Sequence, residues 1–126
     1  MRIEYDGTNF VGWQSQKNGD TVQDNIEKVL KKILKEKIRI SGAGRTDKGV
    51  HAFSQFANFY FNKEINNKKS FLNSLNFFLK KKMISILDIK KKSKKFHARH
   101  SAKLRVYEYV IINREGSLSI NHNKAW

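Results

Sequence analysis

Cysteine is absent from the 126 residues of the chain, and no apolar run approaches the roughly 20 residues that span a bilayer. The first absence excludes a disulfide framework and a thiolate metal site, and it gives secretion no support. The start of the sequence also lacks the pattern of a signal peptide. We therefore expect a soluble protein in a reducing cytoplasm, without a membrane partner.

Acidic residues are scarce: 11 Asp and Glu residues stand against 26 Lys and Arg residues, which gives a formal net charge of +15. This imbalance exceeds what solubility requires and indicates a polyanionic partner, with nucleic acid as the first candidate. Lysine runs at 80–82 and 90–95 are typical of solvated surface, with binding of RNA phosphates as an alternative. The four histidines have no tight ligand spacing, so we predict no metal. No glycine-rich phosphate loop supports ATP chemistry.

The length allows one domain with a modest core, and the hydrophobic pattern predicts its elements. Apolar residues recur at helical spacing over 22–34, and Asp20 with Gln23 is a predicted capping box. Ser70 is predicted to cap a second helix over 71–79. Apolar runs predict strands at 2–6, 38–43, 51–61, 83–89 and 105–113.

This order of elements predicts an α+β fold. The first six elements fit a ferredoxin-like βαββαβ sandwich, in which a mostly antiparallel sheet carries its helices on one face. The other face of the sheet is then free to meet a ligand. We find no internal repeat and no second domain, so residues 1–126 are treated as one unit.

Small residues surround one carboxylate at 42–52. Their lack of bulk lets a large substrate approach Asp47, and the adjacent Arg45 and Lys48 favour its ionised form. Asp47 is therefore a candidate nucleophile or base on a loop between two strands. The alternative is an ordinary tight turn, in which Asp47 bonds its own backbone and Gly49 supplies a positive φ. Spacing alone favours the turn.

Basic and aromatic residues alternate in two later segments, 96–99 and 105–109. This composition suits a surface that neutralises phosphates and stacks an exposed base. In a strand, Arg105, Tyr107 and Tyr109 would share one face. A half-buried strand face would have the same pattern, so the segments add weight to an RNA partner without deciding it.

Four ordered segments together resemble the tRNA pseudouridine synthase A family, and the match spans almost the whole chain. They are 4–14, then 21–23, then 44–52, and then 96–99 with Tyr107. The resemblance implies an isomerase that converts uridine to pseudouridine in the anticodon stem-loop of tRNA. No cofactor is expected, because the reaction breaks and makes a bond within one nucleotide without redox change.

The resemblance also implies roles for individual residues. Asp47 is the catalytic aspartate, which attacks the ribose or assists glycosidic cleavage. Tyr107 packs against the target uracil, and Arg45 occupies the space that the nucleotide vacates when it leaves the stack. Further RNA contacts are expected from Lys48, His51, Arg99 and Arg105.

The sequence departs from the family pattern at His100, where an apolar or aromatic residue is usual, and at 79–82, which replaces a proline-containing turn. It also stops at Trp126, about where family members begin a second half. That half supplies a basic partner for the aspartate, an apolar wall under the uracil and part of a homodimer interface. We therefore expect the carboxy-terminal domain to be absent, and little turnover unless a separate chain supplies it.

Two alternatives to an enzyme stay open. One is an inactive remnant that only binds RNA, with an affinity that depends on salt but not on Asp47. The other is an RRM-like module that stacks single-stranded bases on its sheet. No predicted strand carries the glycine-aromatic pattern of that module, so we rank it last.

Overall fold

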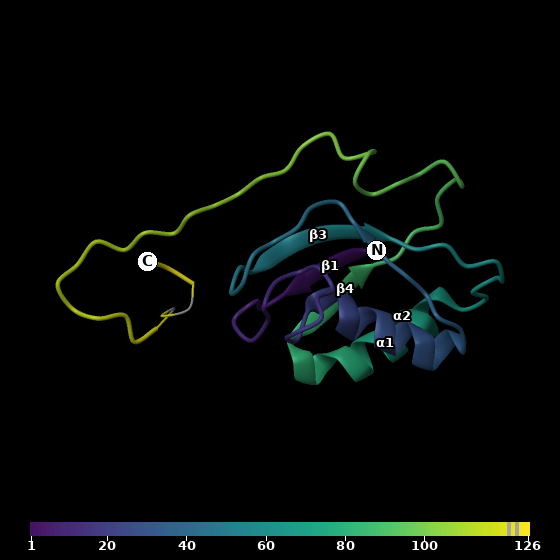
Figure 1. Ribbon diagram of the computed structural model, residues 1–126, viewed down its shortest axis with the longest axis horizontal. Coiled ribbons are helices and arrows are strands. Elements are labelled where there is room, and N and C mark those ends of the chain that lie inside the picture. Colours follow the sequence, from purple (N-terminus) through teal and green to yellow (C-terminus); the bar gives the residue numbers. More distant parts are fainter. Residues whose placement is uncertain (121, 123) are drawn as a thin grey trace.

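The structure is a computed structural model that describes residues 1–120, 122 and 124–126. A four-stranded sheet carries two helices on one face (Figure 1). The strands are β1 (Arg2–Tyr5), β2 (Ser41–Gly42), β3 (Ala52–Asn58) and β4 (Ile84–Asp88), and the helices are α1 (Val22–Leu34), α2 (Lys68–Leu79) and the short 3-10 helix η1 (Lys80–Lys82).

The strand order is β2-β3-β1-β4, and every neighbouring pair is antiparallel. This order is the ferredoxin-like arrangement, so the predicted fold class is confirmed. Neither α1 nor α2 is long and apolar enough to cross a membrane, and this holds for every helix in the described part of the chain.

The core lies between the sheet and the helices. Strands β1 and β4 alternate exposed and buried residues, which places one apolar face of the sheet against the helix layer. Apolar residues at three- and four-residue spacing on α1 and α2 form the opposing surface. The side chains that fill this layer include Ile3, Ile26, Leu30, Leu75, Leu79, Ile84 and Ile86.

Helix α1 begins one residue later than the predicted capping box requires. Thr21 has an extended backbone and accepts a hydrogen bond from the Asp24 amide at 3.1 Å. The predicted box of Asp20 and Gln23 is therefore wrong. Val22 is fully buried and is the first helical residue, which leaves Thr21 at the cap and directs Asp20 to an ion pair with η1.

Helix α2 begins earlier than predicted, because Asn67 caps it. The Asn67 side-chain oxygen accepts from the Ser70 amide at 2.8 Å, so Ser70 lies within the first turn and is not the cap. Asparagine and serine are both good caps. Capping by Asn67 extends the helix by residues 68–70, which lead into the buried Phe71.

The second strand is shorter than predicted, because β2 contains only two residues. Ile38 and Ile40 are buried, as their apolar character predicts. The Ile40 amide, however, donates to the Glu27 carboxylate at 3.0 Å instead of to a neighbouring strand. Burial of apolar side chains therefore predicted the core but not the hydrogen-bond partners. Strands β3 and β4 lie within their predicted ranges.

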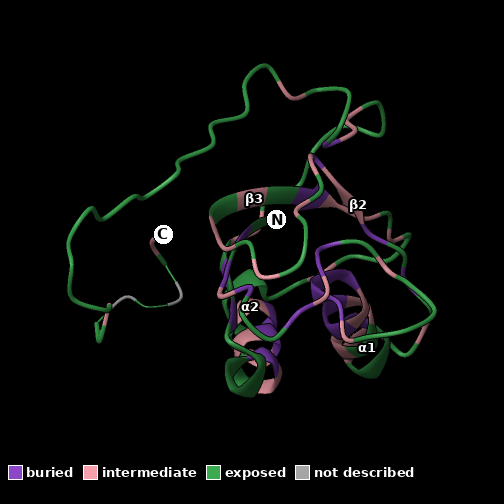
Figure 2. Ribbon diagram, turned by 60° about the vertical axis from the view of Figure 1, so that its left-hand side comes forward, coloured by how far each residue is buried: buried purple, intermediate pink, exposed green. Residues whose placement is uncertain are grey.

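The strand predicted at 105–113 does not form in the described part of the chain. Residues 102–114 belong to no helix or strand and are mostly exposed, and Figure 2 shows this segment leaving the sheet in green. Alternation of side chains allows a strand, but a strand also needs a neighbour with free backbone groups. The segment crosses the side of the sheet opposite the helices (Figure 1) and pairs with none of its strands.

Candidate active site

The loop that carries Asp47 contains a turn at 47–50. The Asp47 carbonyl oxygen accepts from the Val50 amide at 3.2 Å, and Gly49 has a φ of 79°. The predicted turn is therefore present, but its hydrogen bond uses backbone atoms. Among the described residues, no side chain or backbone group bonds the Asp47 carboxylate, which is exposed. The loop therefore forms the turn and also leaves the Asp47 carboxylate exposed to solvent.

A second loop, residues 6–14, holds the Asp47 loop through its backbone. The Trp13 amide donates to the Thr46 carbonyl oxygen at 3.0 Å, and the Gly49 amide donates to the Phe10 carbonyl oxygen at 3.3 Å. Gly12 has a φ of 132°, and an added Cβ would lie 2.8 Å from the Thr46 carbonyl oxygen. The two loops therefore fit together only because a glycine stands at this contact.

Side chains from the sheet support the same loop from below. The hydroxyl groups of Tyr5 and Thr46 lie 2.8 Å apart, and the Gln55 side-chain Nε2 donates to the Gly44 carbonyl oxygen at 3.0 Å. Tyr5 is buried, and this burial raises the pKa of its hydroxyl above the ordinary value. The hydroxyl therefore stays protonated near neutral pH and bonds Thr46 as a neutral group.

His51 lies at the base of the two loops. Its Nδ1 accepts from the Gly7 amide at 3.1 Å and lies 3.2 Å from the Asp6 carboxylate. Hydrogen bonds from the hydroxyl and amide of Thr8, with a smaller contribution from His51, lower the pKa of Asp6. These contacts show that His51 helps to support the loop, and the RNA contact expected of it stays a prediction.

A cleft of about 680 Å³ opens beside the Asp47 loop. Trp13 lies beneath it: an added Cβ on Gly42 would lie 2.6 Å from the indole nitrogen, so the backbone rests directly on the ring. The side chains around the opening are mainly cationic and aromatic. They include Arg45, His97, Arg99, His100, Arg105 and Tyr107.

Arg105 fastens the later segment to the Asp47 loop. Its guanidinium donates to the Ala43 carbonyl oxygen from Nε at 3.0 Å and from Nη2 at 2.7 Å. The same Nη2 also donates to the Arg99 carbonyl oxygen at 3.1 Å. Arg105 and Tyr107 both lie beside Gly44, at ordinary van der Waals distance from where a Cβ on that residue would stand. Arg105 therefore assembles the cleft as well as adding charge to it.

The segment 96–99 forms another wall. Ala98 is buried and its amide donates to the Asn58 side chain at 2.8 Å, which ties the segment to the end of β3. The rings of His97 and His100 lie 4.6 Å apart between centroids. His100, which departs from the family pattern, thus pairs with His97 inside the cleft.

The predicted site residues fall into three groups, one of which is His51 at the base of the two loops. Arg45, Arg99, Arg105 and Tyr107 come together around the cleft, whereas Asp47 and Lys48 are exposed on the adjoining loop. Tyr109 is 90% exposed and does not line the cleft, so its predicted alignment with Arg105 and Tyr107 is wrong. That alignment depended on a strand that does not form. No group of three potential metal ligands occurs within the described residues.

Sequence reasoning missed the residues that support the loop. Tyr5 was placed in a strand and in the recognised segment 4–14 without a role of its own, and Gln55 was not singled out at all. Trp13 lay in a recognised segment without an assigned role. The helpful signal was the density of glycine and aromatic residues in 5–14, which is typical of a backbone packed closely against another loop.

Comparison with known proteins confirms the resemblance. A family model described as tRNA pseudouridine synthase matches residues 1–101. A Pelagibacter ubique protein named tRNA pseudouridine synthase A is 53% identical over 124 residues, which cover 98% of this chain and 50% of the relative. Proteins of the same name from Ehrlichia ruminantium (strain Gardel) and Thermoanaerobacter sp. (strain X514) are 42% and 43% identical, again over 98% of this chain and 50% of the relative. The chain thus spans about half the length of these curated relatives, and it belongs to the tRNA pseudouridine synthase family.

Proposed function

We propose that this chain supplies the catalytic aspartate, Asp47, and part of the uridine-binding cleft of a pseudouridine synthase that acts on the anticodon stem-loop of tRNA. The observation that carries the proposal is the placement of an exposed carboxylate on a loop held by backbone contacts, beside a cleft rich in arginine and aromatic groups. A cytoplasmic location follows from tRNA as the substrate.

The proposed reaction moves uracil on one ribose. The bond between ribose C1′ and uracil N1 breaks, and a bond between C1′ and uracil C5 replaces it, while C5 loses a proton and N1 gains one. No electron carrier is required. Asp47 either attacks the ribose as a nucleophile or assists cleavage as a base, and in both roles its carboxylate acts in the ionised form.

The cleft residues have complementary roles in this proposal. Tyr107 packs against the uracil after the nucleotide leaves its stack, and Arg45 fills the space left behind. Arg99 and Arg105 contact phosphates or hold the segment that does so, and Lys48 and His51 contribute from the loop and its base. The net charge of +15 favours approach of the polyanionic substrate.

We further propose that the site is composite. Among the described residues, no cation pairs with the Asp47 carboxylate, and catalysis by a carboxylate at a ribose needs a fixed electrostatic environment. A second half of the enzyme would supply the basic partner, the apolar wall under the uracil and the homodimer contacts. This half corresponds to the part of the curated relatives that lies outside the match.

Pseudouridine formation in an anticodon stem-loop RNA tests the proposal. The chain is assayed alone, with the second half of a relative added as a separate polypeptide, and with Asp47→Ala. Turnover should require the second half and should fall at least about 10²- to 10⁴-fold in Asp47→Ala. The matched control is Glu64→Ala, an exposed acidic residue on a distant segment, which should leave turnover unchanged.

RNA binding without catalysis is the second candidate, favoured by the exposed basic and aromatic segments around the cleft. It predicts salt-sensitive binding, no pseudouridine with either half present, and the same affinity for Asp47→Ala. Turnover that persists in Asp47→Ala would contradict both candidates.

A further inference from the structure

A cationic stripe runs along the outer surface of helix α1. Lys28, Lys31 and Lys32 are three and four residues apart, so they share one side of α1, and Lys35 is the C-cap residue that directly follows the helix. All four are exposed, and the buried residues Ile26 and Leu30 lie on the opposite side. The stripe therefore faces away from the sheet.

These charges are not neutralised by the fold. Ion pairs in the described residues involve Lys63, Lys68, Lys82, Lys90, Lys91, Arg39 and His51. None of the four stripe lysines has an acidic partner within 4.0 Å among those residues, and neither have the exposed Lys80 and Lys81 at the end of α2. Lys28 helps to lower the pKa of the Asp20 carboxyl, but Asp20 forms its ion pair with Lys82. Among the described residues, no direct ion pair therefore balances the positive charge of the stripe.

Aromatic rings lie beside the stripe. The Lys32 ammonium is 4.0 Å from the centre of the Phe78 ring, which joins the stripe to helix α2. Phe77 packs edge-on against Phe78, with 5.2 Å between ring centres, yet it is 76% exposed. A large apolar ring at the solvent boundary of a basic surface is a ready stacking platform for a base.

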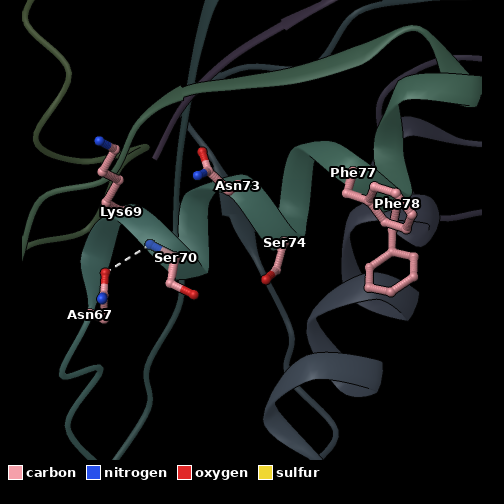
Figure 3. A pocket seen from close by; sticks show the side chains of 7 residues that line it. All are labelled: Asn67, Lys69, Ser70, Asn73, Ser74, Phe77 and Phe78. Carbon is pink, nitrogen blue, oxygen red and sulfur yellow. Dashed lines mark hydrogen bonds between the residues drawn. The ribbon is translucent and has the colours of Figure 1, made fainter.

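A shallow groove of about 550 Å³ continues along α2 from these rings (Figure 3). Its other lining residues offer hydroxyl, amide and ammonium groups, from Ser70, Ser74, Asn73 and Lys69. Such groups can bond ribose hydroxyls and phosphate oxygens. The groove lies on the helix layer. The cleft beside the Asp47 loop is lined in part by Arg105 and Tyr107, from the segment that crosses the other side of the sheet (Figure 1).

We propose that the outer face of α1 and α2 is a second RNA-binding surface, on which the lysine stripe neutralises phosphates and Phe77 with the α2 groove receives a base or ribose. RNA fits better than an anionic membrane, because the surface combines separated cations, one exposed ring and a groove of hydrogen-bonding groups. This surface acts independently of the proposed chemistry at Asp47.

The test compares two triple variants that remove the same charge. One is Lys28→Gln/Lys31→Gln/Lys32→Gln, and glutamine has nearly the helix propensity of lysine. The control is Lys17→Gln/Lys37→Gln/Lys63→Gln, which removes exposed lysines scattered over other segments. The dissociation constant of an unmodified tRNA transcript is measured across a series of salt concentrations.

In the stripe variant, the slope of the logarithm of the dissociation constant against the logarithm of the salt concentration should become about two units less steep. Each lost phosphate contact removes roughly 0.7 to 0.9 from the size of this slope. The control should keep the slope of the parent chain. Equal slopes in all three proteins, or equal losses in both variants, would overturn the proposal. Loss of binding to phosphatidylserine vesicles with unchanged tRNA binding would assign the face to a membrane instead.

Phe77 provides a second readout. Phe77→Leu should weaken tRNA binding by about five- to a hundredfold, whereas Phe77→Tyr keeps the ring and should retain the affinity. Equal affinity for the leucine and tyrosine variants would remove stacking from the proposal. Because these assays measure binding alone, a chain without pseudouridine formation could still have this surface, and an active enzyme could lack it.

Discussion

The loop at 42–50 and the segment at 102–112 meet at the same cleft but are held in different ways. Backbone hydrogen bonds from the loop at 6–14 fasten the first, and Tyr5 and Gln55 support it from the sheet. The second segment forms no strand within the described residues, and the Arg105 guanidinium ties it to the loop. The Asp47 loop is therefore held by many backbone contacts, whereas the Arg105 guanidinium ties the segment at 102–112 to the cleft.

This difference matches the roles proposed for the two parts. A catalytic carboxylate must be held to within a fraction of an ångström, which buried backbone contacts achieve. A segment that contacts RNA can tolerate a single anchor, because substrate and the second half of the enzyme would add further contacts. We therefore expect substitutions in the two regions to affect stability and binding in different proportions.

The largest stability change is expected from Gly7→Ala. An added Cβ would lie 2.0 Å from the Val50 carbonyl oxygen, a backbone atom that cannot move without displacing the Asp47 loop. The free energy of unfolding should fall by about 3 kcal/mol in urea denaturation. The control Gly116→Ala meets nothing within 4 Å and should change it by less than about 0.5 kcal/mol. Similar losses in both variants would contradict the loop contact.

Arg105→Lys should separate binding from stability. Lysine cannot reproduce the hydrogen bonds of the guanidinium to the carbonyl oxygens of Ala43 and Arg99. The segment that carries Tyr107 should then no longer be held beside the Asp47 loop. We expect RNA to bind about tenfold more weakly, which corresponds to about 1.4 kcal/mol, while the unfolding midpoint stays unchanged. Arg114→Lys is the control, because Arg114 also bonds two carbonyl groups but lies outside the cleft. An equal effect of both substitutions would argue against a special anchor.

Tyr5→Phe should destabilise the packed side alone. It removes the hydroxyl that bonds Thr46 and should cost about 1 kcal/mol in the free energy of unfolding. Tyr109→Phe, at a residue that is 90% exposed, should have no measurable effect. If the two variants unfold at the same urea concentration, the support from Tyr5 is negligible.

The smallest effect is expected from pH. A hydrogen bond from Lys82, opposed by partial burial, lowers the pKa of Asp20, which links the start of α1 to η1. A lowered folded-state pKa adds stability above the unfolded value near about 4, and that stability is lost as the pH falls through the folded value. In Asp20→Asn, the free energy of unfolding should therefore decline less steeply below about pH 4 than in the parent chain. The difference should be less than about 1 kcal/mol, because the ion pair is partly exposed. An unchanged decline would contradict this role of Asp20.

The sequence predicted the packed region better than the segment at 102–112. The periodicity over 22–34 and the strand patterns led to the correct fold, because burial of one face controls both signals. The capping residues were wrong by one to three positions, since several neighbouring side chains can accept the same amide. The strand at 105–113 was wrong because side-chain alternation carries no information about the partner of a strand.

The candidate site was predicted in the same uneven way. Arg45, Arg99, Arg105 and Tyr107 were predicted to contact RNA or the target uridine, and the structure places all four around one cleft. Their roles in binding stay predictions. The anchoring of Arg105 on Ala43 could not be read from sequence, because it depends on how two distant segments meet. Assignment of catalysis to Asp47 stays a prediction that only turnover can test.

Amide hydrogen exchange tests most directly whether Asp47 is presented by a preformed loop. The amides of Ala43, Trp13 and Val50 are bonded to backbone oxygens around the loop and should exchange slowly, near the rate set by global unfolding. The amides of 104–109 should exchange at nearly the rate of an unfolded chain. Equal and rapid exchange in both regions would contradict the account, because the aspartate would then lack the rigid support on which its proposed role depends.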